Sequence, residues 1–211
     1  MGGIAYKSLR RSIQRPGHEG RSSPIGYVPT DSSGNVIDNS GVTIGVGFDL
    51  GQHNDYDLKK MGFSKDLRTK LKDFLGKKGS EAKKIAGDLK VSGQDYLELI
   101  LRPINYKIDR IAEKYDKKAG KDSFKNLEPE LQKTIFSVMY QMGVEGETGA
   151  PEFWRQATSK DWTGMLNNLQ SGGWGKYQPR RTRQLDELLN SGAVQKQIIY
   201  DMDKKENFLS D

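Results

Sequence analysis

The sequence predicts an α+β fold, with a small antiparallel β meander near the N-terminus and a mainly helical region after it. Turn clusters rich in serine, glycine, aspartate and asparagine separate short β-prone runs in residues 21–52. From residue 53 onward the apolar residues recur at helical spacing. A length of 211 residues suits a single domain pinched into two lobes and is short for two independent domains.

The β-prone runs are residues 25–28, 36–37 and 42–48. The last run alternates regularly and predicts one strand that continues to Asp49. Its apolar side chains point to one side of the strand, and the other side carries Thr43, Gly45, Gly47 and Asp49. The two glycines on that side leave a floor over which a sugar ring could pass close to the backbone.

Helices are predicted over 66–74 and 80–89, and Ser92 is a suitable N-cap for a longer helix of about 93–116. Leu97, Leu101, Ile104, Ile108, Ile111 and Tyr115 should share one face of that helix. Further helices are expected at 129–142, 152–157, 162–169, 179–190 and 194–202. This pattern predicts a small lobe of about 15–91, a connecting helix of about 93–116 and a helical lobe of about 117–211.

The composition limits the possible functions. Lysine and arginine outnumber aspartate and glutamate by 34 to 28, a modest excess that supports an anionic partner without choosing one. There is no cysteine, which excludes disulfides and thiolate catalysis, and only two histidines are present, which disfavours zinc. No apolar run approaches the ~20 residues of a membrane span, and the first residues lack the pattern of a signal peptide.

Three polar residues suggest glycoside hydrolysis, which needs one carboxyl to protonate the leaving oxygen and polar groups to hold a water on the opposite side. Glu19 lies between a Pro16-Gly17 break and Gly20, where a partly buried carboxyl could stay protonated. Thr43 and Asp49 could hold the water. A straight strand would separate them by ~20 Å, so the hypothesis requires a bend at Gly45 or Gly47.

Two other interpretations are weaker. The spacing Gly45-x-Gly47-x-x-x-Gly51 follows a strand, but no βαβ unit follows it, as a dinucleotide site would require. A metal site from His18, His53, Asp49 and Asp55 lacks the usual ligand spacing.

Several segments, in order, resemble phage-type lysozymes and, more closely, the pesticin-like lysozyme toxin domains. They are His18-Glu19-Gly20, Val42 to Gly47, Leu131 to Gly143, Trp162 to Leu169 and Pro179 to Arg183. The resemblance implies a lysozyme-like fold in which Glu19 is the general acid and Thr43 positions water or faces substrate. It also implies that Gln141 contacts the glycan. From their residue types and places, Gly45, Gly47 and Tyr27 are candidate glycan contacts, with core or lobe packing as the alternative for Tyr27. Arg180, Arg181 and Arg183 are expected to form structural ion pairs or to bind the wall.

The second carboxylate departs from the phage pattern, whose aspartate would fall at Val28 or Ile37 in this sequence. The pesticin-like pattern places an aspartate six residues after the threonine, which is Asp49. Asp31, in a nearby turn, is the alternative.

The resemblance implies a bacteriolytic muramidase that cleaves the β-1,4 bond between N-acetylmuramic acid and N-acetylglucosamine, with inversion and without metal or cofactor. A non-catalytic peptidoglycan-binding module and a related chitinase or chitosanase are the alternatives. The expected partners are peptidoglycan and, for a toxin, an immunity protein; nucleic acid and membrane insertion are not expected, and the protein should be monomeric. Synthesis in the cytoplasm without a signal peptide would require holin release, another domain or a secretion system, as for an endolysin, bacteriocin or effector.

Overall fold

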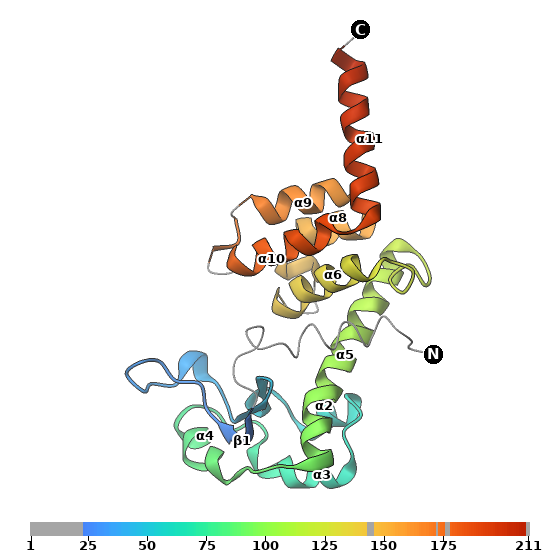
Figure 1. The fold of residues 1–211 in the computed structure, drawn as a ribbon. Coiled ribbons are helices and arrows are strands. Elements are labelled where there is room, and N and C mark those ends of the chain that lie inside the picture. Colours follow the sequence, from blue (N-terminus) through green and yellow to red (C-terminus); the bar gives the residue numbers. More distant parts are fainter. Residues whose placement is uncertain (1–22, 143–145, 172, 176–177, 210–211) are drawn as a thin grey trace. The chain divides into compact units, whose positions relative to one another are not determined.

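The structure is a computed structural model, in which residues 23–142, 146–171, 173–175 and 178–209 are described (Figure 1). The chain divides into two compact units between Tyr106 and Lys107, inside the long helix α5 (Gly93–Ala119). The first unit contains a three-stranded antiparallel sheet and short helices, and the described part of the second is helical. These elements confirm the predicted α+β class.

The sheet of the first unit has the order β1-β2-β3, from β1 (Ser23–Tyr27), β2 (Thr43–Gly45) and β3 (Phe48–Asp49). The helices that follow it are α2 (Asp55–Lys60), α3 (Lys65–Leu71) and α4 (Gly79–Ile85). Short 3-10 turns are η1 (Ile37–Asn39), η2 (Leu50–Gln52), η3 (Lys72–Phe74) and η4 (Ala86–Asp88).

Two predictions about strands are wrong. Val36 makes only an isolated bridge to Thr30, and Ile37 begins the 3-10 turn η1. Asn39 there has φ of 55°, a left-handed conformation that asparagine tolerates better than most residues and that a strand cannot contain. The run from Val42 to Asp49 is also not one strand but two, β2 and β3, joined at Val46 and Gly47.

The core of the first unit joins the sheet, the short helices and the start of α5. Its fully buried members include Val42, Ile44, Leu50, Leu67 and Leu99. The prediction for the start of α5 is wrong at Leu97, which is 50% exposed, because in this unit the helix turns Leu99 into the core instead. Farther along α5, the expected face is correct, with its members Ile104, Ile108, Ile111 and Tyr115 fully buried.

The second unit continues from α5 into α6 (Pro129–Met142), α7 (Gly146–Gly149), α8 (Pro151–Ser159), α9 (Trp162–Gln170), α10 (Gln178–Leu189) and α11 (Gly192–Leu209). Each predicted helix in this region is present. The ends differ most for α11, which begins earlier and ends later than predicted.

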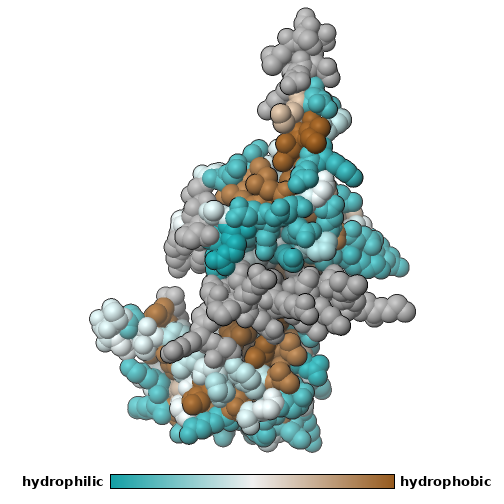
Figure 2. Space-filling model, in the orientation of Figure 1, coloured by the Kyte–Doolittle hydropathy of each residue, from teal (hydrophilic) through white to brown (hydrophobic). Residues whose placement is uncertain are grey.

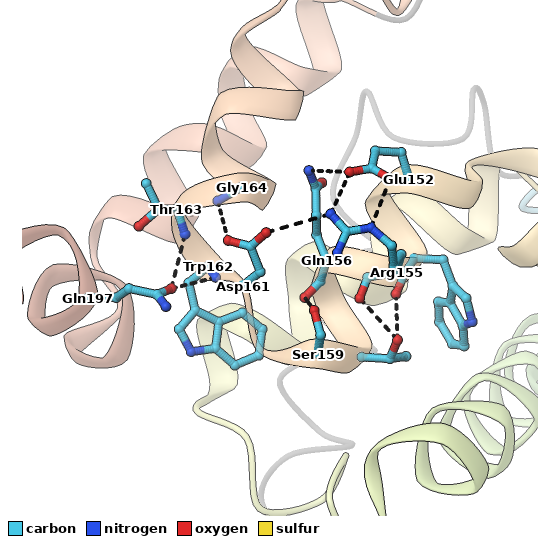
Figure 3. Close-up of polar contacts among 11 residues, drawn as sticks. Glu152, Arg155, Gln156, Ser159, Asp161, Trp162, Thr163, Gly164 and Gln197 are labelled. Carbon is cyan, nitrogen blue, oxygen red and sulfur yellow. Dashed lines mark hydrogen bonds and ion pairs between the residues drawn. The ribbon is translucent and has the colours of Figure 1, made fainter. Parts of the chain in front are cut away.

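Polar side chains tie α8, α9 and α11 together (Figure 3). Asp161 is the N-cap of α9 and accepts from the backbone N–H of Gly164 at 2.8 Å. Gln197, from α11, accepts from the first two amides of the same helix, at 2.6 Å from Trp162 and 3.1 Å from Thr163. These bonds satisfy amides that have no partner within α9, and they fasten α11 to it.

Candidate active site

The strands β2 and β3 form a hairpin that brings Thr43 and Asp49 side by side. The two residues are direct register partners, as are Ile44 and Phe48. Gly45 has φ of 64° and Gly47 has φ of 89°, and such values favour glycine. The Cβ atoms of directly paired residues lie about 4.5–5.5 Å apart, in place of the ~20 Å of a straight strand. The bend that the hydrolysis hypothesis requires is therefore present.

Tyr27 extends this pair across the sheet. It is the register partner of Thr43 on β1, so Tyr27, Thr43 and Asp49 form one row across the three strands. Directly paired residues project from the same face of a sheet. Tyr27 and Asp49 are half-buried, and Thr43 is only 3% exposed. Three of the predicted site residues are thus neighbours in one row that crosses all three strands of the sheet.

Backbone amides hold the carboxylate of Asp49. Oδ1 accepts from the N–H of Gly51 at 2.8 Å and from that of Gly41 at 3.1 Å. Oδ2 lies 3.2 Å from the Gly41 nitrogen and 3.3 Å from Nε2 of Gln52. The bond to Gly51 also makes Asp49 the N-cap of η2. Asp49 therefore has a structural role in addition to any chemical one.

Gly41 connects Thr43 to Asp49, a role that we did not predict from the sequence. Its N–H donates to Asp49, and its carbonyl accepts from the hydroxyl of Thr43 at 3.2 Å. A Cβ on Gly41 would lie 2.4 Å from Cα of Gly51 and 2.6 Å from Oδ1 of Asp49. Only glycine fits there. The sequence signal was a glycine directly before the polar strand and another two residues after the aspartate.

Asp31, the alternative second carboxylate, lies in an exposed turn outside the three strands. It accepts from the backbone N–H groups of Asn35 and Ser33, at 2.8 and 2.9 Å, and from the side chain of Asn35. These bonds, the Asn35 amide foremost, hold the pKa of the Asp31 carboxyl below its ordinary value. The contacts are those of a side chain that stabilises its own turn.

The predicted glycan floor is only partly open. Gly45 is buried, and a Cβ there would lie 3.8 Å from the Leu99 carbonyl oxygen and 3.8 Å from Ile100, both in α5. Gly47 is exposed. Gly45 therefore allows the backbone conformation of the turn but gives no surface for a sugar. Of these two glycines, only Gly47 can be reached from solvent.

The hairpin lies in a part of the chain that matches a known protein family. Residues 13–163 match the model of the family "Pesticin: Bacterial toxin homologue of phage lysozyme, C-term". The chain belongs to the Pesticin family. The match covers well over half of the chain and confirms the resemblance drawn from the sequence. No curated protein sequence matches the chain significantly.

The part matched by the Pesticin family model contains Glu19, Thr43, Asp49 and Gln141. Glu19 and His18 lie outside the described residues, so the assignment of the acid stays a prediction. In the part that the structure does describe, no three histidine, aspartate or glutamate side chains converge as a metal site, and no helix is long and apolar enough to cross a membrane.

Gln141 lies near the end of α6, in the second unit of this Pesticin-family chain. Its Oε1 accepts from the guanidinium of Arg181 at 2.8 Å, so its amide N–H groups are directed away from that arginine. Arg181 also donates to Gln184, which in turn donates to Ser137. The guanidinium of Arg181 lies over the ring of Trp174 and is fully buried, which excludes Arg181 as a wall-binding surface charge.

A pocket of about 340 Å³ lies next to Trp174 in the same unit. Its lining includes Met142, Pro151, Phe153, Asn168 and Ser171. The indole N–H of Trp174 donates to the carbonyl of Asn168 at 3.0 Å, which fixes the ring beside the pocket.

Proposed function

We propose that the protein is a muramidase that hydrolyses the β-1,4 bond between N-acetylmuramic acid and N-acetylglucosamine in peptidoglycan. Glu19 protonates the glycosidic oxygen, and Asp49 and Thr43 hold the attacking water. The observation that carries the proposal is the pairing of Thr43 with Asp49, joined through Gly41, in a chain of the Pesticin family. Residues 1–211 act as one catalytic domain.

The hydrogen-bond polarity of the pair suits a nucleophilic water. Thr43 donates its hydroxyl proton to the Gly41 carbonyl, so its oxygen can only accept from a further partner. An ionised Asp49 also only accepts. A water between them therefore donates both protons to the protein and directs a lone pair outward, toward the anomeric carbon. Asp49 then takes a proton as the new bond forms.

This route inverts the anomeric centre. It requires the carboxyls of Glu19 and Asp49 to lie ~6.5–9.5 Å apart, whereas a separation near 5 Å would support a retaining mechanism. Asp49 is preferred to Asp31 as the second carboxylate because it shares the row of Thr43, while Asp31 serves its own turn.

The proposed biological role is lysis of bacterial cell walls by a toxin, effector or endolysin. The excess of lysine and arginine, 34 against 28 acidic residues, favours association with an anionic wall. A toxin of this kind needs an immunity protein in the producing cell. The protein acts as a monomer on the periplasmic face, after delivery by a holin, another domain or a secretion system.

Digestion of purified peptidoglycan tests the proposal. Mass spectrometry should show new reducing ends on N-acetylmuramic acid, and NMR of the first product should show the inverted anomer. Glu19→Gln should keep its circular dichroism spectrum and lose hydrolysis. Binding to peptidoglycan without hydrolysis would instead identify a non-catalytic module, and new N-acetylglucosamine reducing ends would identify a different bond specificity.

A further inference from the structure

The two carboxylate oxygens of Asp49 are not equivalent. Oδ1 accepts from two backbone amides, at 2.8 Å from Gly51 and 3.1 Å from Gly41. Oδ2 has longer contacts, at 3.2 Å to the Gly41 nitrogen and 3.3 Å to the side chain of Gln52. Because the Gly41 N–H is shared with Oδ1 and both contacts of Oδ2 are longer, Oδ2 is the oxygen that is held more weakly and that a water can approach. The only side chain that holds Oδ2, among the described residues, is that of Gln52.

Lys78 determines how the amide of Gln52 is turned. Nζ of Lys78 donates to Oε1 of Gln52 at 2.9 Å. An ammonium group can only donate, so Oε1 must face Lys78 and Nε2 must face the carboxylate. Lys78 is half-buried, and its backbone forms a β-bridge with Gly41. The backbone from which the Lys78 side chain extends is therefore held next to the hairpin. Without Lys78, the amide could rotate and present its oxygen to Asp49.

We infer that Gln52 is a positioning residue for the catalytic oxygen Oδ2 of Asp49, and that Lys78 acts through Gln52. The inference rests on the proposed muramidase function. Gln52 is exposed and lies outside the core, so the contact contributes little to the stability of the fold. We therefore expect Gln52 to affect catalysis. If the Asp49 carboxylate rotates away from the water, kcat falls while the affinity for substrate is unchanged.

A double-mutant cycle tests the inference, with hydrolysis of soluble, uncross-linked peptidoglycan chains as the assay. Gln52→Ala and Lys78→Met should each lower kcat by about tenfold and leave KM unchanged. The double variant should be no slower than Gln52→Ala, because Lys78 has nothing left to orient. Losses that multiply in the double variant, or kcat values equal to that of the unaltered chain, would overturn the inference.

The Gln52→Glu variant allows a second test, the pH dependence of kcat, which should not change if Gln52 has only a structural role. The new carboxylate can still accept from Lys78 but places a like charge against Oδ2. A neighbouring like charge favours the protonated form of a carboxyl, so the acid limb of the kcat profile should move to higher pH. An unmoved limb counts against the inference.

Lys77→Met is the matched control, since it removes the same charge one residue away. Lys77 pairs with Glu81 and not with Gln52, so kcat and its pH profile should be unchanged. If the unaltered chain hydrolyses no peptidoglycan, the proposed function fails and the inference falls with it. If Asp49→Asn abolishes hydrolysis while the cycle shows no effect, the inference alone is wrong.

Discussion

Asp49 has different surroundings from the other acidic residue considered for its role, although both occur in turn-rich sequence. Asp49 is half-buried beside Thr43 and is bound by amides of two glycines. Asp31 is exposed and is bound by the amides of its own turn. The chemistry available to a carboxylate thus depends on which neighbours the hairpin supplies.

Replacement of each aspartate by asparagine should separate these roles. Asp49→Asn should lower kcat on peptidoglycan by about 100-fold or more, because the proposed base is lost while the side chain keeps its size. Asp31→Asn should leave kcat unchanged, since that residue has only its turn to stabilise. Turbidity clearance by both variants at equal concentration measures the difference. Equal losses in the two variants would contradict the assignment of Asp49.

Gly41→Ala should damage both the fold and the reaction. The added Cβ would lie 2.4 Å from Cα of Gly51, a backbone atom that cannot move without shifting the hairpin. We expect a loss of about 1–3 kcal/mol in the free energy of unfolding, measured by urea titration, together with most of the activity. Gly87→Ala is the control, because a Cβ there meets nothing within 4 Å. A Gly41→Ala variant as stable and active as the Gly87→Ala variant would refute the close packing.

At the scale of elements, helix termini are held by side chains that lie far away in the sequence. Glu128, just before α6, accepts from the Ser191 hydroxyl at 2.7 Å and from the Ala193 backbone N–H at 3.1 Å, at the start of α11. The Ser191 hydroxyl foremost, and the amides of Ala193 and Gly192, hold the pKa of the Glu128 carboxyl below its ordinary value. One carboxylate thereby joins the start of α6 to the start of α11.

Glu128→Gln should lower the free energy of unfolding by about 1 kcal/mol at pH 7, the usual value of a lost cap. A carboxyl whose folded pKa is depressed stabilises the fold above its unfolded value of 4.5, and that contribution disappears as pH falls through the folded pKa. The difference from the unaltered chain should therefore vanish at acid pH. Urea titrations at pH 7 and at about pH 3 measure it. A difference of the same size at both pH values would contradict the charge-dependent cap.

At the scale of the whole molecule, the exposed surface combines a net charge of +6 with a few exposed apolar side chains. The charge is spread along the chain and does not form one block. Ile199 and Met202 on α11 are more than half exposed. Figure 2 shows hydrophobic surface along the part of the chain where this helix lies. Association with an anionic wall should therefore depend on long-range charge more than on any one contact.

Salt should weaken wall association more than hydrolysis itself. Raising the ionic strength from about 0.01 M to about 0.15 M shortens the Debye length from about 30 Å to about 8 Å. The fraction of protein that sediments with insoluble peptidoglycan should fall, while kcat on short soluble glycan fragments should change little. Sedimentation that is independent of salt would show that charge does not drive the association.

Local pattern was enough to predict the α+β class, the helices α6, α8, α9, α10 and α11 and the Pesticin-like motifs, since helical periodicity and turn residues act over a few positions. It missed the four-residue helix α7. It also identified Thr43 and Asp49 as a pair that could work only if the chain bends between them. These predictions depend on residues close in sequence. The assignment of Glu19 rests on the resemblance alone.

The tertiary structure decided what depends on distant partners. It turned the run from Val42 to Asp49 into a hairpin, buried Gly45 against α5, and exposed Leu97 where Leu99 enters the core. It also placed the amide of Gly41 on Asp49 and the ammonium of Lys78 on Gln52. The burial of Gly45, the choice of Leu99 over Leu97 and the contact of Lys78 with Gln52 have no local signature, because each depends on groups that only the packed chain brings together.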